Sequence, residues 1–346
     1  MKNILVNIQT MSMCAMAVSL FSCQQLDSSD ASQSPPQSQD KPQVAFLSSQ
    51  SGNLEVYLKD LNTNELTQIT SNTLDDLNPV WSNNGEYLAF VGRTLKTTYL
   101  NVYNTSTKQT TTLVNDSYKP SWINWSPLKN ELVFVGKEQN DSNLYTVNLE
   151  GSINLIFNSG TGSLVSPKYS NNGSTIAVIE NDNLSLFKNG TVINEVLPKK
   201  FRILDFDWGS GNNTLYVTAR VNREVNIHEV NIDTLETRIL IEGPHLDVEA
   251  RYFPPNKIAF LSSRIDGGTR QLYLYNTDSQ EIKQLTRDNI EVLHPSWSPT
   301  GEHITYVTNV GQQFTSMILD TESGEATPIS LEEKGFHLLP TIRPMQ

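Results

Sequence analysis

The sequence predicts an all-β protein, a β-propeller built of four-stranded blades. Three observations predict it. A short apolar run recurs at intervals of 39 to 46 residues, an aromatic residue precedes most of these runs by nine positions, and turns rich in asparagine, proline and glycine lie between. A repeat of this length corresponds to one propeller blade. Seven apolar runs can be counted, so we expect seven blades, with six as the alternative.

The apolar runs have the composition of strands that are buried on both faces. Each run has a large or branched residue at the matching position: Phe46, Phe90, Phe134, Val178, Val217, Phe260 and Tyr306. The preceding aromatic residues end a short first strand of each unit: Trp81, Trp125, Tyr169, Trp208, Tyr252 and Trp297. Because they recur once per unit, we expect these aromatic side chains to fill the space between neighbouring blades.

Two further strands follow each apolar run. The third strand alternates, as in LEVYLKD, and the fourth is more polar, as in ELTQIT. Segments such as SNNGE and SPTGE are predicted to be the turns that join the first two strands. Asparagine and proline favour turns, and glycine tolerates the positive φ that a tight turn requires. The first unit lacks its own first strand, whereas 337–346 places Pro340 and Ile342 where other units have their proline and aromatic residue. We therefore expect the C-terminal strand to close the first blade.

The start of the chain differs from the rest. Residues 1–22 resemble a lipoprotein signal peptide, and LFSC resembles a bacterial lipobox, with Cys23 as the lipidated residue. Residues 23–42 are rich in Gln, Ser, Asp and Pro and predict a flexible tether, and 43–346 form the propeller. We expect a lipid-anchored protein on the periplasmic side of the bacterial cell envelope. The glutamines after Cys23, in place of the aspartate linked to inner-membrane retention, favour the outer membrane.

Composition and motifs narrow the function classes. The net charge of -12 disfavours binding to nucleic acid. Both cysteines, Cys14 and Cys23, lie in the leader, so the propeller has no internal disulfide. The sequence has no G-x-S-x-G nucleophile elbow and no Walker or Rossmann glycine pattern. We therefore expect no cofactor and no hydrolase site of those kinds.

The repeated phrases also resemble a known family. PVWSNNGEYLAF and PSWSPTGEHITY are similar to the TolB-type propeller repeat, P-x-W-S-P-D-G-x-x-I-A-F. The resemblance covers nearly all of 43–346 and implies the fold, but this repeat occurs in proteins of many roles. TolB has an α/β domain before a six-bladed propeller. Here the propeller directly follows the tether, so we expect a free-standing TolB-like propeller.

The binding site is expected on one face of the ring. Loops that lead from one blade to the next share this face with loops that join the second and third strands. We predict that this face and the channel mouth bind a protein loop, a peptide or a small polar ligand. The candidate residues are Asp75, Asp76, Arg220, Arg264, Arg270, His294 and His337. The protein would then be a non-catalytic scaffold for another envelope protein or a peptide.

An enzyme is the alternative. His245, His294 and His337 fall in loops of the same face, and histidines from different blades could converge on a metal, as in propeller lyases that cleave acidic polysaccharides. The protein would then be a metal-assisted glycan lyase or hydrolase. However, His294 and His337 occupy different positions within their units, so equivalent geometry is not implied. His228 and His303 lie within strands and indicate structural roles. A structural spacer is a third alternative.

Overall fold

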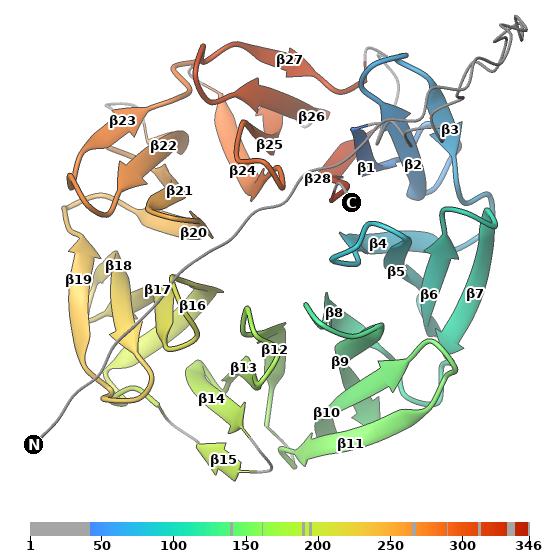
Figure 1. The fold of residues 1–346 in the computed structure, drawn as a ribbon, viewed down its shortest axis with the longest axis horizontal. Coiled ribbons are helices and arrows are strands. Elements are labelled where there is room, and N and C mark those ends of the chain that lie inside the picture. Colours follow the sequence, from blue (N-terminus) through green and yellow to red (C-terminus); the bar gives the residue numbers. More distant parts are fainter. Residues whose placement is uncertain are drawn as a thin grey trace, which may run out of the picture. The chain divides into compact units, whose positions relative to one another are not determined.

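The computed structural model describes residues 42–138, 141–160, 162–188, 191–193, 196–264, 268–288, 290–310, 313–330 and 336–344. The predicted signal peptide, Cys23 and nearly all of the predicted tether lie outside these ranges. The described residues form strands β1 to β28 and no helix, so none of them belongs to a helix that could cross a membrane. Seven four-stranded antiparallel sheets surround a central axis (Figure 1). The predicted seven-bladed propeller is confirmed.

The blades follow one another along the chain. Blade 1 contains β28 (His337–Ile342), β1 (Gln43–Ser48), β2 (Glu55–Asp60) and β3 (Leu66–Gln68). Blade 2 contains β4 (Asp75–Trp81), β5 (Tyr87–Arg93), β6 (Thr98–Asn104) and β7 (Gln109–Val114). Blade 3 contains β8 (Ser121–Trp125), β9 (Glu131–Glu138), β10 (Asp141–Asn148) and β11 (Ile153–Asn158). Blade 4 contains β12 (Leu164–Tyr169), β13 (Thr175–Glu180), β14 (Asn183–Lys188) and β15 (Thr191–Ile193).

The last three blades repeat this order from the innermost to the outermost strand. Blade 5 contains β16 (Phe201–Trp208), β17 (Thr214–Val221), β18 (Glu224–Asn231) and β19 (Thr237–Ile241). Blade 6 contains β20 (Asp247–Phe253), β21 (Lys257–Ser262), β22 (Gln271–Asn276) and β23 (Ile282–Gln284). Blade 7 contains β24 (Glu291–Trp297), β25 (His303–Val310), β26 (Gln313–Asp320) and β27 (Ala326–Pro328).

The ring closes as the sequence predicts. The C-terminal strand β28 pairs antiparallel with β1, with Ile342 opposite Val44. The next residue, Arg343, holds this strand in place from the next blade, because its Nε donates to the Gly85 carbonyl oxygen at 2.7 Å. Gly85 has a φ of 65°, and a Cβ there would lie 2.4 Å from the Pro344 carbonyl oxygen. Only glycine therefore allows the C-terminal segment to pack so closely on this turn.

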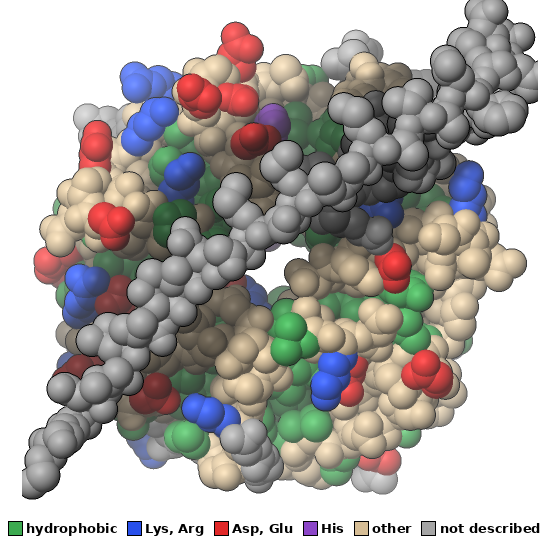
Figure 2. Space-filling model, viewed as in Figure 1, with side chains coloured by type: hydrophobic (Ala, Val, Ile, Leu, Met, Phe, Trp, Pro, Cys, Tyr) green, Lys and Arg blue, Asp and Glu red, His purple; other side chains and the backbone are tan. Residues whose placement is uncertain are grey.

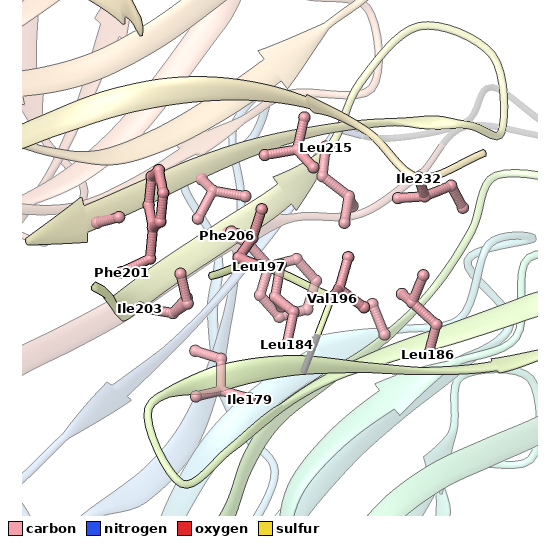
Figure 3. Close-up of a cluster of buried hydrophobic side chains, with 14 of the residues drawn as sticks. Ile179, Leu184, Leu186, Val196, Leu197, Phe201, Ile203, Phe206, Leu215 and Ile232 are labelled. Carbon is pink, nitrogen blue, oxygen red and sulfur yellow. The ribbon is translucent and has the colours of Figure 1, made fainter. Parts of the chain in front are cut away.

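The hydrophobic core lies between blades rather than inside one blade. All seven matching residues of the apolar runs are buried. Between blades 4 and 5, side chains from β13 and β14 pack against side chains from β16 and β17, and Leu184, Phe206 and Leu215 lie in this cluster (Figure 3). Since each middle strand buries both of its faces, it is apolar at nearly every position. This is why the runs stand out in the sequence.

The predicted inter-blade aromatic residues also make a repeated hydrogen bond. In four blades, the tryptophan Nε1–H donates to a backbone carbonyl oxygen on the innermost strand of the preceding blade, at 2.8 to 3.2 Å. The donors and acceptors are Trp81 and Thr341, Trp125 and Val80, Trp208 and Lys168, and Trp297 and Arg251. Each acceptor immediately precedes the aromatic residue, or Ile342, of its own blade. The indole therefore fills the interface and also fixes its register.

Tyrosine replaces tryptophan in blades 4 and 6, and a different bond then joins the blades. The backbone N–H of Tyr169 donates to Asn124 Oδ1 at 3.1 Å, and that of Tyr252 donates to Asp207 Oδ2 at 3.0 Å. Asn124 and Asp207 directly precede the aromatic residue of their own blade. In the tryptophan interfaces, the residue at this position supplies the backbone carbonyl oxygen that accepts the indole hydrogen bond. At the closing interface, the Thr305 hydroxyl donates to the Pro340 carbonyl oxygen at 2.9 Å. All seven blade interfaces are thus bonded near the axis.

Replacing the buried indole should destabilise the ring. In Trp125→Phe, the Val80 carbonyl oxygen loses its donor and the smaller ring leaves a void. We expect the free energy of unfolding to fall by roughly 2 kcal/mol or more in a denaturant titration. The control is Trp122→Phe, three residues away on the same strand but exposed, which should cost less than about 0.5 kcal/mol. Equal losses would show that the indole hydrogen bond and its packing do not control stability.

Candidate functional site

The innermost strand of most blades contains a β-bulge at the same place. In β4, β8, β12, β20, β24 and β28, the pairing with the second strand shifts register about three residues before the aromatic position. The residue at the shift has a φ of 48° to 54°. These residues are Asn78, Trp122, Ser166, Glu249, His294 and Leu339. A left-handed backbone is strained for large side chains, so the bulge costs stability in most blades.

The bulge residues line a cavity on the axis. Its volume is about 490 Å³, and every blade contributes to its wall. Blade 5 contributes Leu204, the unpaired residue where β16 shifts register against β17. Figure 2 shows the ring open at its centre. We name Asn78, Trp122, Ser166, Leu204, Glu249, His294 and Leu339 the channel ring.

The channel ring has an apolar part and a charged part. Trp122 is 45% exposed and Leu204 is 41% exposed. In the neighbouring blades 6 and 7, the backbone N–H of His294 donates to Glu249 Oε2 at 3.0 Å, and the Nδ1 of His294 lies 3.4 Å from the same oxygen. An exposed indole beside a polar wall is typical of sites that bind peptides, because aromatic side chains supply contact area and polar groups supply direction.

Ion pairs hold the charged part of the ring. Glu249 Oε1 lies 3.7 Å from Arg270 Nη1, and Arg270 also bonds Glu291. Burial disfavours the charged form of Glu249, but His294 and Arg251 outweigh it and hold the pKa of this carboxyl below its ordinary value. Arg251 in turn pairs with Asp205. Glu249 is therefore charged at neutral pH and remains an acceptor at the channel wall.

The structure separates the predicted site residues into two groups. His294 lines the channel, and Arg270 pairs with Glu249, which also lines it. Asp75 and Arg220 are exposed at strand ends. Arg264 instead makes a structural contact: its Nη2 donates to both carboxylate oxygens of the buried Asp247, at 3.0 and 3.1 Å. Its guanidinium also covers the rings of Phe260 and Tyr273. A guanidinium fixed in this way has little freedom to meet a ligand.

His294 and His337 do not converge. His337 is buried and stacks on Phe46, with ring centroids 5.6 Å apart, whereas His294 is half exposed in the channel. They occupy different positions of the innermost strand, as the sequence indicates. Within the part of the chain that the structure describes, no three or more His, Cys, Asp or Glu side chains are grouped to hold a metal ion.

Sequence reasoning missed most of the channel ring. The signal was present, because six of the seven residues lie three positions before the aromatic position of their unit, often just before a proline. Only His294 was selected, since its side chain alone suggested chemistry. In blade 5 the lining residue, Leu204, lies four positions before Trp208, in a unit that has lost the proline. Spacing alone does not find that residue.

Asp76 is the most perturbed of the predicted residues. Its side chain is fully buried, and neither carboxylate oxygen has a hydrogen-bond partner among the described residues. Burial raises the pKa of Asp76 to about 7; Thr70 opposes this, and the nearby carboxylate of Glu55 adds to it. Asp247 occupies the corresponding place in blade 6, but there Arg264 neutralises it. Among the residues that the structure describes, no cation pairs with Asp76, and Asp76 is therefore expected to hold a proton below about pH 7.

Fold and repeats define the class: the chain belongs to the TolB β-propeller domain family, which matches residues 20–205, just over half of its length. Among curated proteins, it is 32% identical over 108 residues to the uncharacterized peptidase YuxL of Bacillus subtilis, covering 30% of this chain and 16% of that protein. It is 30% identical over 139 residues to the TolB homolog of Chlorobium chlorochromatii, covering 40% of this chain and 31% of that protein. The chain thus spans less than a third of either relative.

A solved structure supports the fold over a longer range. An oligogalacturonate lyase in complex with manganese superposes with a TM-score of 0.66 and 18% sequence identity, covering 82% of this chain and 87% of that one. At this level of identity the likeness concerns the fold alone. Membership of the family and this likeness are compatible with a binding protein and with an enzyme, so the function must be argued from the site.

Asp76→Asn should change how stability depends on pH. Between about pH 4 and 7, folded Asp76 keeps a proton that the unfolded chain has released. The free energy of unfolding therefore falls as the pH rises, by up to about 1.4 kcal/mol per pH unit. The neutral amide removes this contribution, so the variant should gain stability over the parent between pH 5 and 8 in denaturant titrations.

The matched control for this experiment is Asp247→Asn. This change leaves Arg264 without its carboxylate partner, so we expect a loss of stability throughout the range from pH 5 to 8. Parallel pH profiles for Asp76→Asn and the parent would show that Asp76 does not titrate in this range.

Proposed function

We propose that this protein is a non-catalytic binding protein whose channel ring receives an extended segment of another protein. The observation that carries the proposal is Trp122. Its side chain is 45% exposed although its backbone has a φ of 48°. Neither burial nor backbone preference favours tryptophan at this position, whereas contact with a ligand would.

The size and chemistry of the channel favour a segment over a folded partner. A cavity of about 490 Å³ admits a loop, a tail or a peptide but not a domain. Trp122 and Leu204 offer apolar contact, and Glu249 and Asn78 offer polar groups on other sides of the same ring. An extended chain has an unpaired backbone that such polar groups can bind while its side chains meet the apolar part.

We further propose that the protein acts in the bacterial cell envelope, anchored by a lipid on Cys23. Membership of the TolB propeller family supports the envelope, and the lipobox-like sequence supports the anchor. The periplasmic side of the outer membrane is favoured, because glutamines follow Cys23. The membrane contact would be made by the lipid only.

The anchor is tested by Cys23→Ser. Only the thiol accepts the diacylglyceryl group, and more than one acyl chain is needed for stable anchoring. We expect the parent in the membrane fraction, and the variant either in the soluble exported fraction or unprocessed. A parent protein that fractionates as soluble periplasmic protein would rule out the lipid anchor.

The channel is tested by photo-crosslinking in cells. A photoreactive amino acid replaces Leu204, and adducts are identified with and without Trp122→Ala. We expect one protein adduct whose yield falls at least tenfold in the Trp122→Ala background, while the melting temperature of the protein stays unchanged. The control position is Asn83, in a turn between the first two strands of blade 2 at the opposite end of those strands.

Two outcomes would contradict the proposal. The same adduct formed from position 83 and not from 204 would place the interface on the other face of the ring. Stoichiometric transition metal in the purified protein, lost in His294→Ala, would instead support the metal-assisted enzyme that the sequence left open.

A further inference from the structure

Blade 5 has a concentration of positive charge at the end of the ring where β16 begins. The loop before β16, the end of β17 and the turn after it all meet there. Five exposed cationic side chains lie on these segments: Lys199, Lys200, Arg202, Arg220 and Arg223. We name them the blade 5 cationic surface. It is notable in a chain whose net charge is -12.

The three arginines of this surface are weakly paired. Arg202 and Arg220 are directly opposite one another in the register of β16 and β17, an arrangement of like charges that destabilises a sheet. Among the described residues, Arg220 and Arg223 form no ion pair with a carboxylate. Arg202 pairs with Asp182 at 2.9 Å, but both side chains are more than half exposed, so the pair is weak and a competing carboxylate can replace it.

A cleft adjoins the surface. It has a volume of about 720 Å³ and lies between the β13–β14 turn of blade 4 and the start of β16. Lys199 and Arg202 line it, together with Phe201, whose ring is anchored in the core between the two blades (Figure 3). Glu180 also lies in the wall, where its Oε2 accepts the Ser185 hydroxyl at 2.6 Å. The cleft therefore adjoins the exposed cations, and its wall carries two carboxylates, Glu180 and Asp182, beside Lys199 and Arg202.

The chemistry of these groups favours carboxylates. Guanidinium groups bind carboxylates with two parallel hydrogen bonds, and three of the five cations are arginines. A long polyphosphate would extend over the negatively charged remainder of the protein and be repelled. The carboxylates of a short acidic segment can lie close to these cations, which act over roughly 8–10 Å at physiological salt.

We propose that the blade 5 cationic surface binds a short acidic segment of a partner protein. Leu204 lies two residues after Arg202 on β16 and faces the channel. A segment bound at this surface can therefore continue to the channel ring. Only the assignment of both sites to one partner rests on the proposed function of the channel ring. The binding of carboxylates at the blade 5 cationic surface does not depend on that function.

The test is fluorescence anisotropy with three labelled peptides and the whole protein. The probes are deca-glutamate, deca-glutamine and deca-lysine, measured at low and at physiological salt. We expect deca-glutamate alone to bind, and more weakly at higher salt. Arg220→Gln combined with Arg223→Gln should weaken its binding at least tenfold. Neither arginine has an ion-pair partner among the described residues, so the fold should be unaffected, and a melting curve checks this.

Two controls separate local from general effects. Lys129→Gln combined with Lys283→Gln makes the same change in net charge at exposed sites outside the surface, and it should change the affinity less than twofold. Trp122→Ala should also leave the binding of deca-glutamate unchanged, so that failure of the channel function and failure of this proposal give different results.

Several results would overturn the proposal. These are no binding of deca-glutamate at low salt, equal binding of deca-lysine, or equal weakening by the two pairs of substitutions. Preferential binding of a ten-residue thymidine oligonucleotide would assign the surface to phosphates. Binding to phosphatidylglycerol vesicles without binding to deca-glutamate would assign it to a lipid surface.

Discussion

The contact between an aromatic side chain and the preceding blade is the interaction on which this fold depends. No blade has a core of its own, since each middle strand buries its two faces against two different neighbours. The ring is therefore as stable as its interfaces. The indole N–H bonds place a directional constraint inside four of the interfaces. Where tyrosine replaces tryptophan, its backbone N–H bonds to Asn124 or Asp207 instead, and the interface keeps a directional bond.

The same constraint creates the channel ring. An innermost strand must present its aromatic residue to the preceding blade and still pair with its own second strand. A bulge before the aromatic residue adds twist to the strand, and the residue at the bulge is left unpaired. In six blades that residue adopts a positive φ, and in all seven blades the corresponding residue lines the axial cavity. Ligand contacts are thus available at positions that the packing of the ring leaves free.

The sequence predicted the architecture well and the site poorly, for physical reasons. Blade number and closure follow from periodic burial, which every unit repeats, so Pro340 and Ile342 were recognisable as a missing first strand. The environment of a single polar residue depends on its neighbours across blades. Asp76 and Asp247 occupy matching positions, yet one is uncompensated and the other is held by Arg264. No local pattern in the sequence distinguishes the two.

Blade 5 differs from the repeat in ways that the ring does not require. Its first strand lacks the proline, its bulge shifts by one residue, and its lining residue is a leucine without the positive φ of the other six. Two arginines also face each other across its first two strands. Trp208 still makes the inter-blade bond at 3.1 Å, so these differences are not needed for closure. In a repeat protein, residues that all units share maintain the scaffold. Blade 5 keeps its scaffold contacts but departs from the repeat at other positions, and two of these departures place like charges opposite each other. Such a departure destabilises the sheet, so selection for binding is a better explanation for it than selection for stability.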